Sequence, residues 1–396
     1  MTAVAAPAPA RPVEPRRTLL MVISEDWFFW SHRRALALAA HEAGFDVVIA
    51  APERAHADAI RGLGLTLVPL RELDRRSRRP VQEWRTVREL VRVYREVRPD
   101  LVHHVTIKPV LYGSLAARLA GVPAVINGIY GLGHVFSGRG QRAALLRTAV
   151  TAAYRASFRL LGRRLHVTFE NAADRDRFIR LGICRTTQAS VIRGMGFDPV
   201  TFHPRPFPAG EPVVMMAGRL LWSKGVRQLV EAVARARANG AVCRLALVGA
   251  PDPGNPAAVP ESQLREWAAA GAAEWWGHRS DMPQALEQAT IVALPSAYAE
   301  GLPKVLIEAA AVGRPLVATD IPGCREIVRD GENGYLVPSD DVPALAGAID
   351  RLVRDRALRE RFGRRSHELS VEFTDAVVNR ETLELYHALL AAERRP

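Results

Sequence analysis

The apolar positions of this chain form short runs, and between the runs apolar residues recur every three or four positions. A run of four to six apolar residues is typical of a strand buried on both faces, whereas the longer spacing is typical of a helix with one buried face. The runs that predict strands are 19–24, 46–50, 65–69, 101–105, 124–127, 165–169 and 189–192, then 213–217, 244–248, 274–276, 291–294, 316–318 and 335–337. This alternation predicts an α/β protein with parallel sheets.

A proline-rich stretch, residues 202–212, interrupts the alternation and predicts a linker. We therefore expect two doubly wound, Rossmann-like domains, residues 18–204 and 205–374, with a disordered tail at 1–17 and a terminal helix at 375–396. Ligands of such sheets bind beyond the carboxyl ends of the strands, so the site is expected in a cleft between the two domains.

Composition and charge restrict the cellular compartment and the binding partners that we expect. The three cysteines lie far apart in the chain, which fits neither a disulfide framework nor a metal cluster and favours a reducing cytoplasm. No apolar run approaches the roughly 18 residues of a spanning helix, so we expect a soluble or peripheral protein. Residues 1–200 carry 31 Lys and Arg against 17 Asp and Glu, and the rest carry 23 against 25. The first domain is thus expected to meet a polyanion: lipid headgroups, nucleic acid or a phosphorylated substrate.

Two carboxylates flank a predicted helix start after the run 291–294. Glu300 lies in the loop, Glu308 lies within the helix, and Pro303 suits the first helical turn. The unpaired N–H groups and positive dipole end of such a terminus suit a diphosphate. The alternative is an amphipathic helix with two solvated glutamates.

A second loop at the same sheet edge carries Arg219 and Lys224, with Ser223 expected to cap the next helix. A forked guanidinium and a compact ammonium together suit two phosphate groups, although solvated cations in an ordinary turn would look the same. A third loop with His278 and Arg279 opens nearby.

These loops form an ordered series that resembles the donor domain of retaining glycosyltransferases of family 4, which have the two-Rossmann GT-B fold. The residues that carry the resemblance are Gly218-Arg219-Leu220, Ser223-Lys224-Gly225, Gly277 to Asp281, Glu300 to Pro303 with Glu308, and the segments 319–326, 330–334 and 336–338. The segments 24–33, 106–113, 127–136 and 169–171 resemble the subgroup that assembles bacterial surface polysaccharides and lipid-linked oligosaccharides.

The resemblance implies a role for each matching residue. Arg219 and Lys224 would clamp the donor diphosphate and stabilise the leaving group, in place of a metal or any cofactor. Glu300 would orient the donor sugar and Glu308 would bind the ribose. The remaining implied donor contacts are Gly218, the backbone of Gly301, Leu302, Pro303 and Lys304, and His278 and Arg279 beside the nucleobase. The donor is expected to be a nucleotide-diphosphate sugar, with UDP favoured.

The acceptor side is less clear from sequence. Many relatives carry a histidine after the fifth strand, where this chain has Asn127-Gly128-Ile129-Tyr130. The candidates for acceptor contact are His32, Arg33, His104 and Lys108, with His103 beside them, although each histidine could instead be structural.

Two basic amphipathic stretches, 84–98 and 139–164, suggest docking of the first domain on an anionic membrane. The alternative is core-facing helices with solvated arginines. The first of these two hypotheses predicts a cytoplasmic, peripheral protein on the inner face of the membrane.

Together these observations predict a retaining, metal-independent transferase that moves a sugar onto a polyprenyl-diphosphate-linked acceptor in polysaccharide biosynthesis. Transfer to a soluble natural product, or epimerisation of a sugar nucleotide, are the alternatives within this fold. A metal site at Asp174 and Asp176, glycoside hydrolysis by the glutamate pair and nucleic-acid binding are each disfavoured by the positions of the residues concerned.

Overall fold

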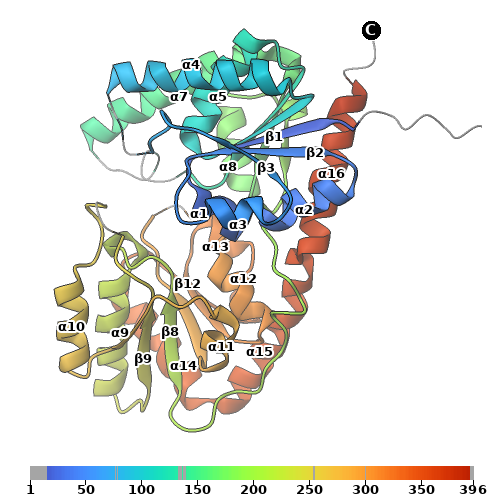
Figure 1. Cartoon of the computed structure of the whole chain (residues 1–396). Coiled ribbons are helices and arrows are strands. Elements are labelled where there is room, and N and C mark those ends of the chain that lie inside the picture. Colours follow the sequence, from blue (N-terminus) through green and yellow to red (C-terminus); the bar gives the residue numbers. More distant parts are fainter. Residues whose placement is uncertain are drawn as a thin grey trace, which may run out of the picture.

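Two parallel sheets, each covered by helices on both faces, form the two domains of the computed structural model (Figure 1). It describes residues 16–75, 77, 79–132, 136, 140–252, 255–298 and 300–392. The first sheet has the order β3-β2-β1-β4-β5-β6-β7 and the second β10-β9-β8-β11-β12-β13. The first contains β1 (Thr18–Ile23), β2 (Asp46–Ala51), β3 (Thr66–Pro69), β4 (Leu101–Val105), β5 (Ala124–Ile129), β6 (Leu165–Phe169) and β7 (Ala189–Val191). The second contains β8 (Val213–Ala217), β9 (Arg244–Val248), β10 (Glu274–Gly277), β11 (Ile291–Leu294), β12 (Leu316–Thr319) and β13 (Gly334–Val337).

Every run that predicted a strand is a strand, which confirms the fold class. The observed bounds differ from the predicted ones by at most about two residues, as is usual at strand ends, where the hydrogen-bond pattern frays.

The first sheet separates two apolar cores, because successive side chains of a strand point to opposite faces. Leu20 and Val22 of β1 belong to one core, and Leu19 and Met21 belong to the other. Helices α4 (Pro80–Val97), α5 (Ile107–Ala120), α7 (Gln141–Leu161) and α8 (Ala172–Arg180) pack over the first core. Helices α1 (Asp26–His32), α2 (Arg34–Glu42) and α3 (Ala57–Arg61) pack over the second.

The second sheet lies in one contiguous core with its own helices. These are α9 (Val226–Ala238), α10 (Glu261–Ala269), α11 (Met282–Glu287), α12 (Lys304–Ala311), α13 (Pro322–Arg325), α14 (Val342–Arg354) and α15 (Arg356–Ser370). Arg314, which is fully buried, ties the proline-rich segment to this domain by donating to the carbonyl oxygens of Arg205 (2.9 Å) and Pro206 (2.8 Å). A buried guanidinium with several carbonyl partners fixes the path of this segment.

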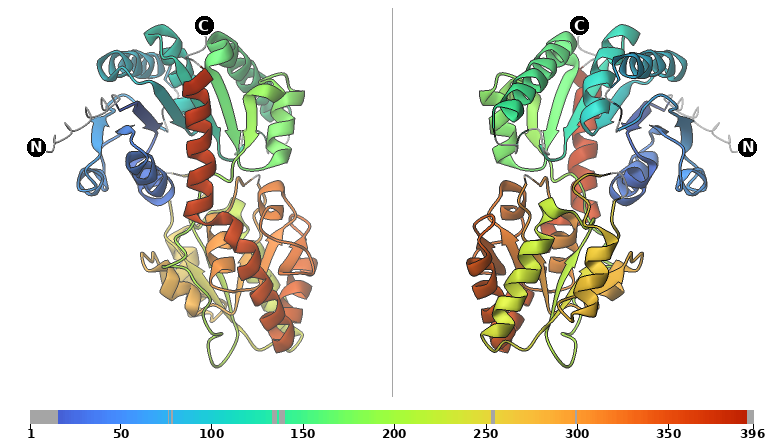
Figure 2. Two further views of the ribbon diagram at one scale, coloured as in Figure 1. Left: turned by 90° about the vertical axis from the view of Figure 1, so that its right-hand side faces the viewer. Right: turned by 90° about the vertical axis from the view of Figure 1, so that its left-hand side faces the viewer.

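The last helix, α16 (Asp375–Ala392), runs from the second domain back onto the first (Figures 1 and 2). It packs against α2, and its fully buried Tyr386 contacts Phe45. The hydroxyl of Tyr386 forms a 2.7 Å hydrogen bond with Nδ1 of His103 on β4. The chain therefore crosses between the domains twice, once before β8 and once through the stretch that leads into α16.

One prediction about local structure is wrong. Ser223 does not cap a helix: it lies in a short 3₁₀ turn, Trp222–Lys224, and α9 begins after Gly225, whose φ is +78°. A Cβ at Gly225 would lie 2.0 Å from the carbonyl oxygen of Pro295, so the tight approach of these two loops requires glycine. Pro303 is the N-cap residue of α12, one position before the helix itself.

Candidate active site

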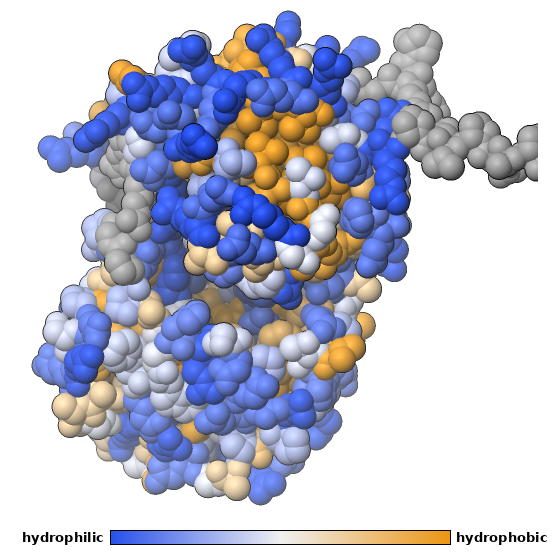
Figure 3. All heavy atoms as spheres, in the orientation of Figure 1, coloured by the Kyte–Doolittle hydropathy of each residue, from blue (hydrophilic) through white to orange (hydrophobic). Residues whose placement is uncertain are grey.

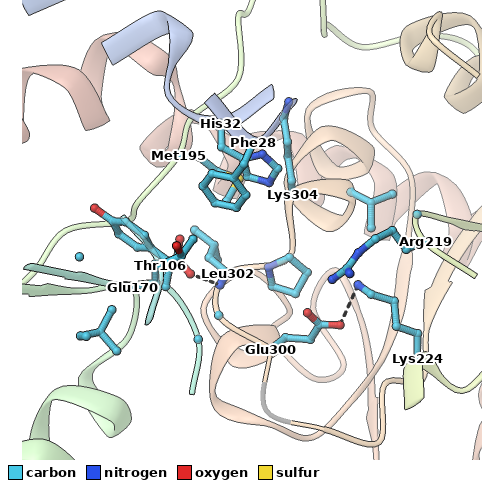
Figure 4. A pocket seen from close by; sticks show the side chains of 18 of the residues that line it. Phe28, His32, Thr106, Glu170, Met195, Arg219, Lys224, Glu300, Leu302 and Lys304 are labelled. Carbon is cyan, nitrogen blue, oxygen red and sulfur yellow. Dashed lines mark hydrogen bonds and ion pairs between the residues drawn. The ribbon is translucent and has the colours of Figure 1, made fainter. Parts of the chain in front are cut away.

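A cavity of about 550 Å³ lies between the carboxyl edges of the two sheets. The surface is hollowed between the two domains in the view of Figure 3, and Figure 4 shows the lining from close by. The first domain contributes Trp27, Phe28, His32, Thr106, Tyr130 and Glu170 among others. The second contributes Gly218, Arg219, Lys224, Glu300, Gly301, Leu302, Pro303, Lys304 and Glu308. The cavity is therefore where the sequence predicted a ligand between the domains.

Lys224 and Glu300 form an ion pair at the floor of the cavity, with 2.9 Å between Nζ and Oε1 (Figure 4). Both side chains are largely buried, at 14% and 11% exposure. The hydroxyls of Ser296 (3.0 Å) and Tyr298 (3.2 Å) also donate to the Glu300 carboxylate. Burial lowers the pKa of Lys224, but the carboxylate of Glu300 raises it, and the net pKa lies above the ordinary value, so Lys224 is a fixed cation.

Arg219 lies beside Lys224 and is more exposed (42%). Its Nη1 lies 3.2 Å from Oδ2 of Asp252, which in turn accepts from Arg75 of the first domain at 3.3 Å. Arg75 also pairs with Glu25 at 3.0 Å. This chain of charges joins the two domains next to the position predicted for the diphosphate.

The start of α12 enters the cavity between these cations and the first domain. Nζ of Lys304 donates to the carbonyl oxygen of Ser31 (2.9 Å) and lies 3.3 Å from Oε1 of Glu308. Burial raises the pKa of Glu308, which Lys304 partly offsets. Glu300 and Glu308 therefore both line the cavity, each beside a lysine.

The two residues predicted beside the nucleobase lie elsewhere. His278 is exposed, and Arg279 pairs with Asp281 at 2.5 Å; neither lines the cavity described above. They follow β10, whose Gly277 carbonyl accepts from the N–H of Gly249 at the same sheet edge. Their contact with a base stays a prediction.

Among the acceptor candidates, only His32 lines the cavity. Burial, followed by the charges of Lys304 and Arg33, holds its pKa well below the ordinary value, so it is neutral near pH 7. A neutral imidazole among cations can still accept or donate a hydrogen bond to a ligand.

The other acceptor candidates do not line the cavity and have partners within the first domain. Lys108 pairs with Glu83 at 2.6 Å and donates to two backbone carbonyls. His104 is fully buried between the hydroxyl of Tyr94 (2.8 Å) and Asn127 (2.7 Å). Arg33 is buried against the ring of Tyr130, 3.9 Å from the ring centroid. Sequence position after a strand did not distinguish residues that face the cleft from residues that turn into the domain.

No role in the site was predicted for Thr106, Tyr130 or Glu170, although all three line the cavity and fall in the segments that carry the resemblance. Thr106 follows β4 with a φ of +79°, an uncommon conformation for a residue with a branched Cβ, and its hydroxyl bonds Ser24 at 2.8 Å. Tyr130 stands directly after β5, and its hydroxyl forms a 2.9 Å hydrogen bond with Nε2 of His103.

Asp174 and Asp176 do not face each other. Asp174 is buried and accepts from the amide of Asn171, whereas Asp176 is half exposed and pairs with Arg175. Across the described parts of the chain, no cluster of three or more His, Cys, Asp or Glu residues suits a metal ion.

Comparison with known proteins identifies the family. The profile of "Glycosyl transferases group 1" matches residues 211–355, and that of "Glycosyl transferase 4-like" matches residues 18–162. The chain is 26% identical over 359 residues to N,N'-diacetylbacillosaminyl-diphospho-undecaprenol alpha-1,3-N-acetylgalactosaminyltransferase of Campylobacter jejuni, covering 87% of this chain and 92% of that protein. It is 34% identical over 164 residues to the lipopolysaccharide core biosynthesis glycosyltransferase LpsE of Rhizobium meliloti, covering 41% of this chain and 46% of that protein.

Among solved structures, HepE of Anabaena in complex with UDP has a TM-score of 0.74 and 19% sequence identity, covering 94% of this chain and all of that one. The matched regions span both sheets and contain the cations, the glutamates and the helix start that line the cavity. The chain therefore belongs to the group 1 glycosyltransferases of family 4 and has their GT-B fold.

Proposed function

We propose that the protein is a retaining, metal-independent glycosyltransferase that transfers a sugar from a UDP-sugar to a polyprenyl-diphosphate-linked acceptor during polysaccharide biosynthesis. The observation that carries the proposal is the convergence of Arg219, Lys224 and the start of α12 on one cavity. Breaking the sugar–phosphate bond leaves negative charge on the diphosphate. Two fixed cations and a helix dipole placed beforehand stabilise that charge without a metal.

Glu300 and Glu308 bind the uncharged parts of the donor. Glu300, already held by Ser296 and Tyr298, orients the transferred sugar, and Glu308 binds the ribose once Lys304 shifts from it. The acceptor hydroxyl attacks from the side on which the diphosphate leaves, which retains the configuration. No side chain needs to form a covalent bond with the sugar.

The choice of donor and acceptor rests on the relatives. HepE is bound to UDP, and the C. jejuni relative, by its name, acts on a sugar linked to diphospho-undecaprenol and forms an alpha linkage. An acceptor with a lipid tail places the first domain at a membrane surface.

The outer face of the first domain suits such a surface. Helices α4 and α7 both pack against α5, and all three helices carry exposed apolar side chains among their arginines. These side chains are Val81 (67% exposed), Trp84 (56%), Leu119 (52%), Leu145 (72%), Leu146 (52%) and Leu160 (48%). Trp84 and Leu145 fall in the two stretches, 84–98 and 139–164, for which the sequence suggested membrane docking, and both side chains are exposed. No helix in the described residues is long and apolar enough to cross a membrane.

The test is a thermal-shift panel of UDP, GDP, ADP and CMP derivatives, followed by transfer assays with the best donor in excess chelator. A ligand that binds only the folded state raises the melting temperature. We expect UDP derivatives to give the largest shift and chelator to leave the rate unchanged. A strict requirement for Mg²⁺ or Mn²⁺ would contradict the metal-independent mechanism.

A further inference from the structure

Glu170 is a carboxylate at the boundary between the domains that the proposed mechanism leaves without a role. It directly follows β6, is only 2% exposed and lines the cavity on the side of the first domain (Figure 4). Charged side chains are rarely this buried without a partner.

One oxygen of this carboxylate joins the two domains. Oε2 accepts a 2.7 Å hydrogen bond from the backbone N–H of Leu302, just before α12 (Figure 4). The other oxygen, Oε1, is buried and has no hydrogen-bond partner among the residues that the structure describes. Burying an acceptor without a hydrogen bond costs free energy. An unpaired acceptor in the wall of a cavity is therefore a candidate for a hydrogen bond to a ligand.

Two glycines make room for the carboxylate. A Cβ at Gly301 would lie 2.0 Å from Oε2, and a Cβ at Gly194 would lie 2.5 Å from Oε1. One glycine comes from each domain, so both sides of the cleft leave space for Glu170 to reach Leu302.

The charges along the cavity decide which part of a substrate Glu170 can contact. Arg219 and Lys224 lie on one side of the α12 start, and Glu170 lies on the other (Figure 4). A phosphate group would be attracted to the cations and repelled by the carboxylate. A hydroxyl group, by contrast, can donate to Oε1.

The protonation of Glu170 changes near neutral pH. Burial raises its pKa, Arg33, from the junction of α1 and α2, and the Leu302 N–H lower it, and Asp174 of α8 and Glu300 raise it; the net pKa is about 7. The carboxyl group is therefore mostly ionised, and able to accept at both oxygens, only above this pH.

We propose that Glu170 is a sugar-binding residue contributed by the first domain: Oε2 positions the backbone at Leu302, and Oε1 accepts a hydrogen bond from a sugar hydroxyl. The inference rests on the proposed function. The hydroxyl belongs either to the transferred sugar or to the acceptor sugar, and kinetics separates the two.

The test compares Glu170→Gln with Asp176→Asn, a matched change of a half-exposed carboxylate on the neighbouring α8. The amide oxygen of Gln still accepts from Leu302, but its NH₂ group replaces Oε1 with a donor. We expect kcat/KM to fall roughly 10- to 100-fold in Glu170→Gln, as for loss of a charge-assisted hydrogen bond, and to stay unchanged in the control. UDP affinity, measured by calorimetry, should be the same in all three proteins.

The activities that Glu170→Gln loses show whether the hydroxyl belongs to the donor sugar or to the acceptor sugar. If the hydroxyl belongs to the donor, the variant also loses acceptor-independent hydrolysis and the extra affinity of the UDP-sugar over UDP. If it belongs to the acceptor, hydrolysis is preserved and the acceptor KM rises. The wild-type rate should rise with pH through about 7, and Glu170→Gln should lack this step.

A folded Glu170→Gln protein with wild-type kinetics for both substrates and a wild-type pH profile would overturn the inference. Absence of nucleotide-sugar binding or turnover in the wild-type protein would instead contradict the proposed function. Glu170→Asp, which keeps the charge but shortens the reach, should retain the pH step with a reduced rate.

Discussion

Replacing Lys224 by methionine separates its structural role from its role at the leaving group. The change removes the cation from a buried pair, in which Nζ and Oε1 of Glu300 are 2.9 Å apart, and keeps most of the side-chain volume. Removing one partner of a buried pair costs about 3–5 kcal/mol. Because Ser296 and Tyr298 still donate to the carboxylate, we expect the free energy of unfolding to fall by about 3 kcal/mol, the lower end of that range.

Activity should fall for a different reason. One preorganised donor to developing negative charge is worth roughly 10²- to 10³-fold in kcat. The double variant Lys224→Met/Glu300→Gln should therefore regain most of the stability, since no charge is left buried alone, without regaining activity. Lys224→Arg keeps the charge and should retain more activity than Lys224→Met.

The measurements are urea unfolding at pH 7 and initial rates of UDP release. Because the folded-state pKa of Lys224 is raised, the stabilisation by the pair is present at pH 7 and is lost only above the ordinary pKa of lysine. A folded Lys224→Met protein with near wild-type kcat would refute the leaving-group role. Recovery of activity in the double variant would do the same.

Three further predictions concern the rest of the molecule. Arg314→Met should lower the free energy of unfolding by about 3 kcal/mol, measured by urea titration, because it removes the hydrogen bonds of a fully buried guanidinium to the carbonyls of the proline-rich segment. Tyr386→Phe should cost about 1 kcal/mol by the same measurement, because it removes the hydrogen bond to His103; an unchanged midpoint would contradict this anchor of α16. Trp84→Ser/Leu145→Ser should weaken flotation with anionic liposomes, and high salt should weaken it further; no binding to anionic or neutral liposomes would favour a soluble acceptor.

The sequence could predict the elements because each strand and helix is coded by local periodicity. All the strands follow from runs of apolar residues, and the loops with Arg219, Lys224 and Glu300 follow from where those strands end. A local pattern gives a wrong prediction where a segment far away in the chain sets the backbone conformation. Ser223 has the properties of a helix cap, but the approach of Pro295 to Gly225 moves the helix start to Val226.

The residues of the site also fall into those that the sequence could predict and those that only the folded structure reveals. The sequence by itself determined the parallel α/β fold and the sheet edge at which the loops of Arg219, Lys224 and Glu300 lie, because residues at the ends of parallel strands must meet at one edge of a sheet. Only the tertiary structure decided which first-domain residues face the cleft: Lys108 turns to Glu83, whereas Glu170 reaches Leu302 across the domain boundary. Such contacts join residues far apart in the chain, and their geometry depends on how the two domains and α16 pack together, which no local pattern encodes.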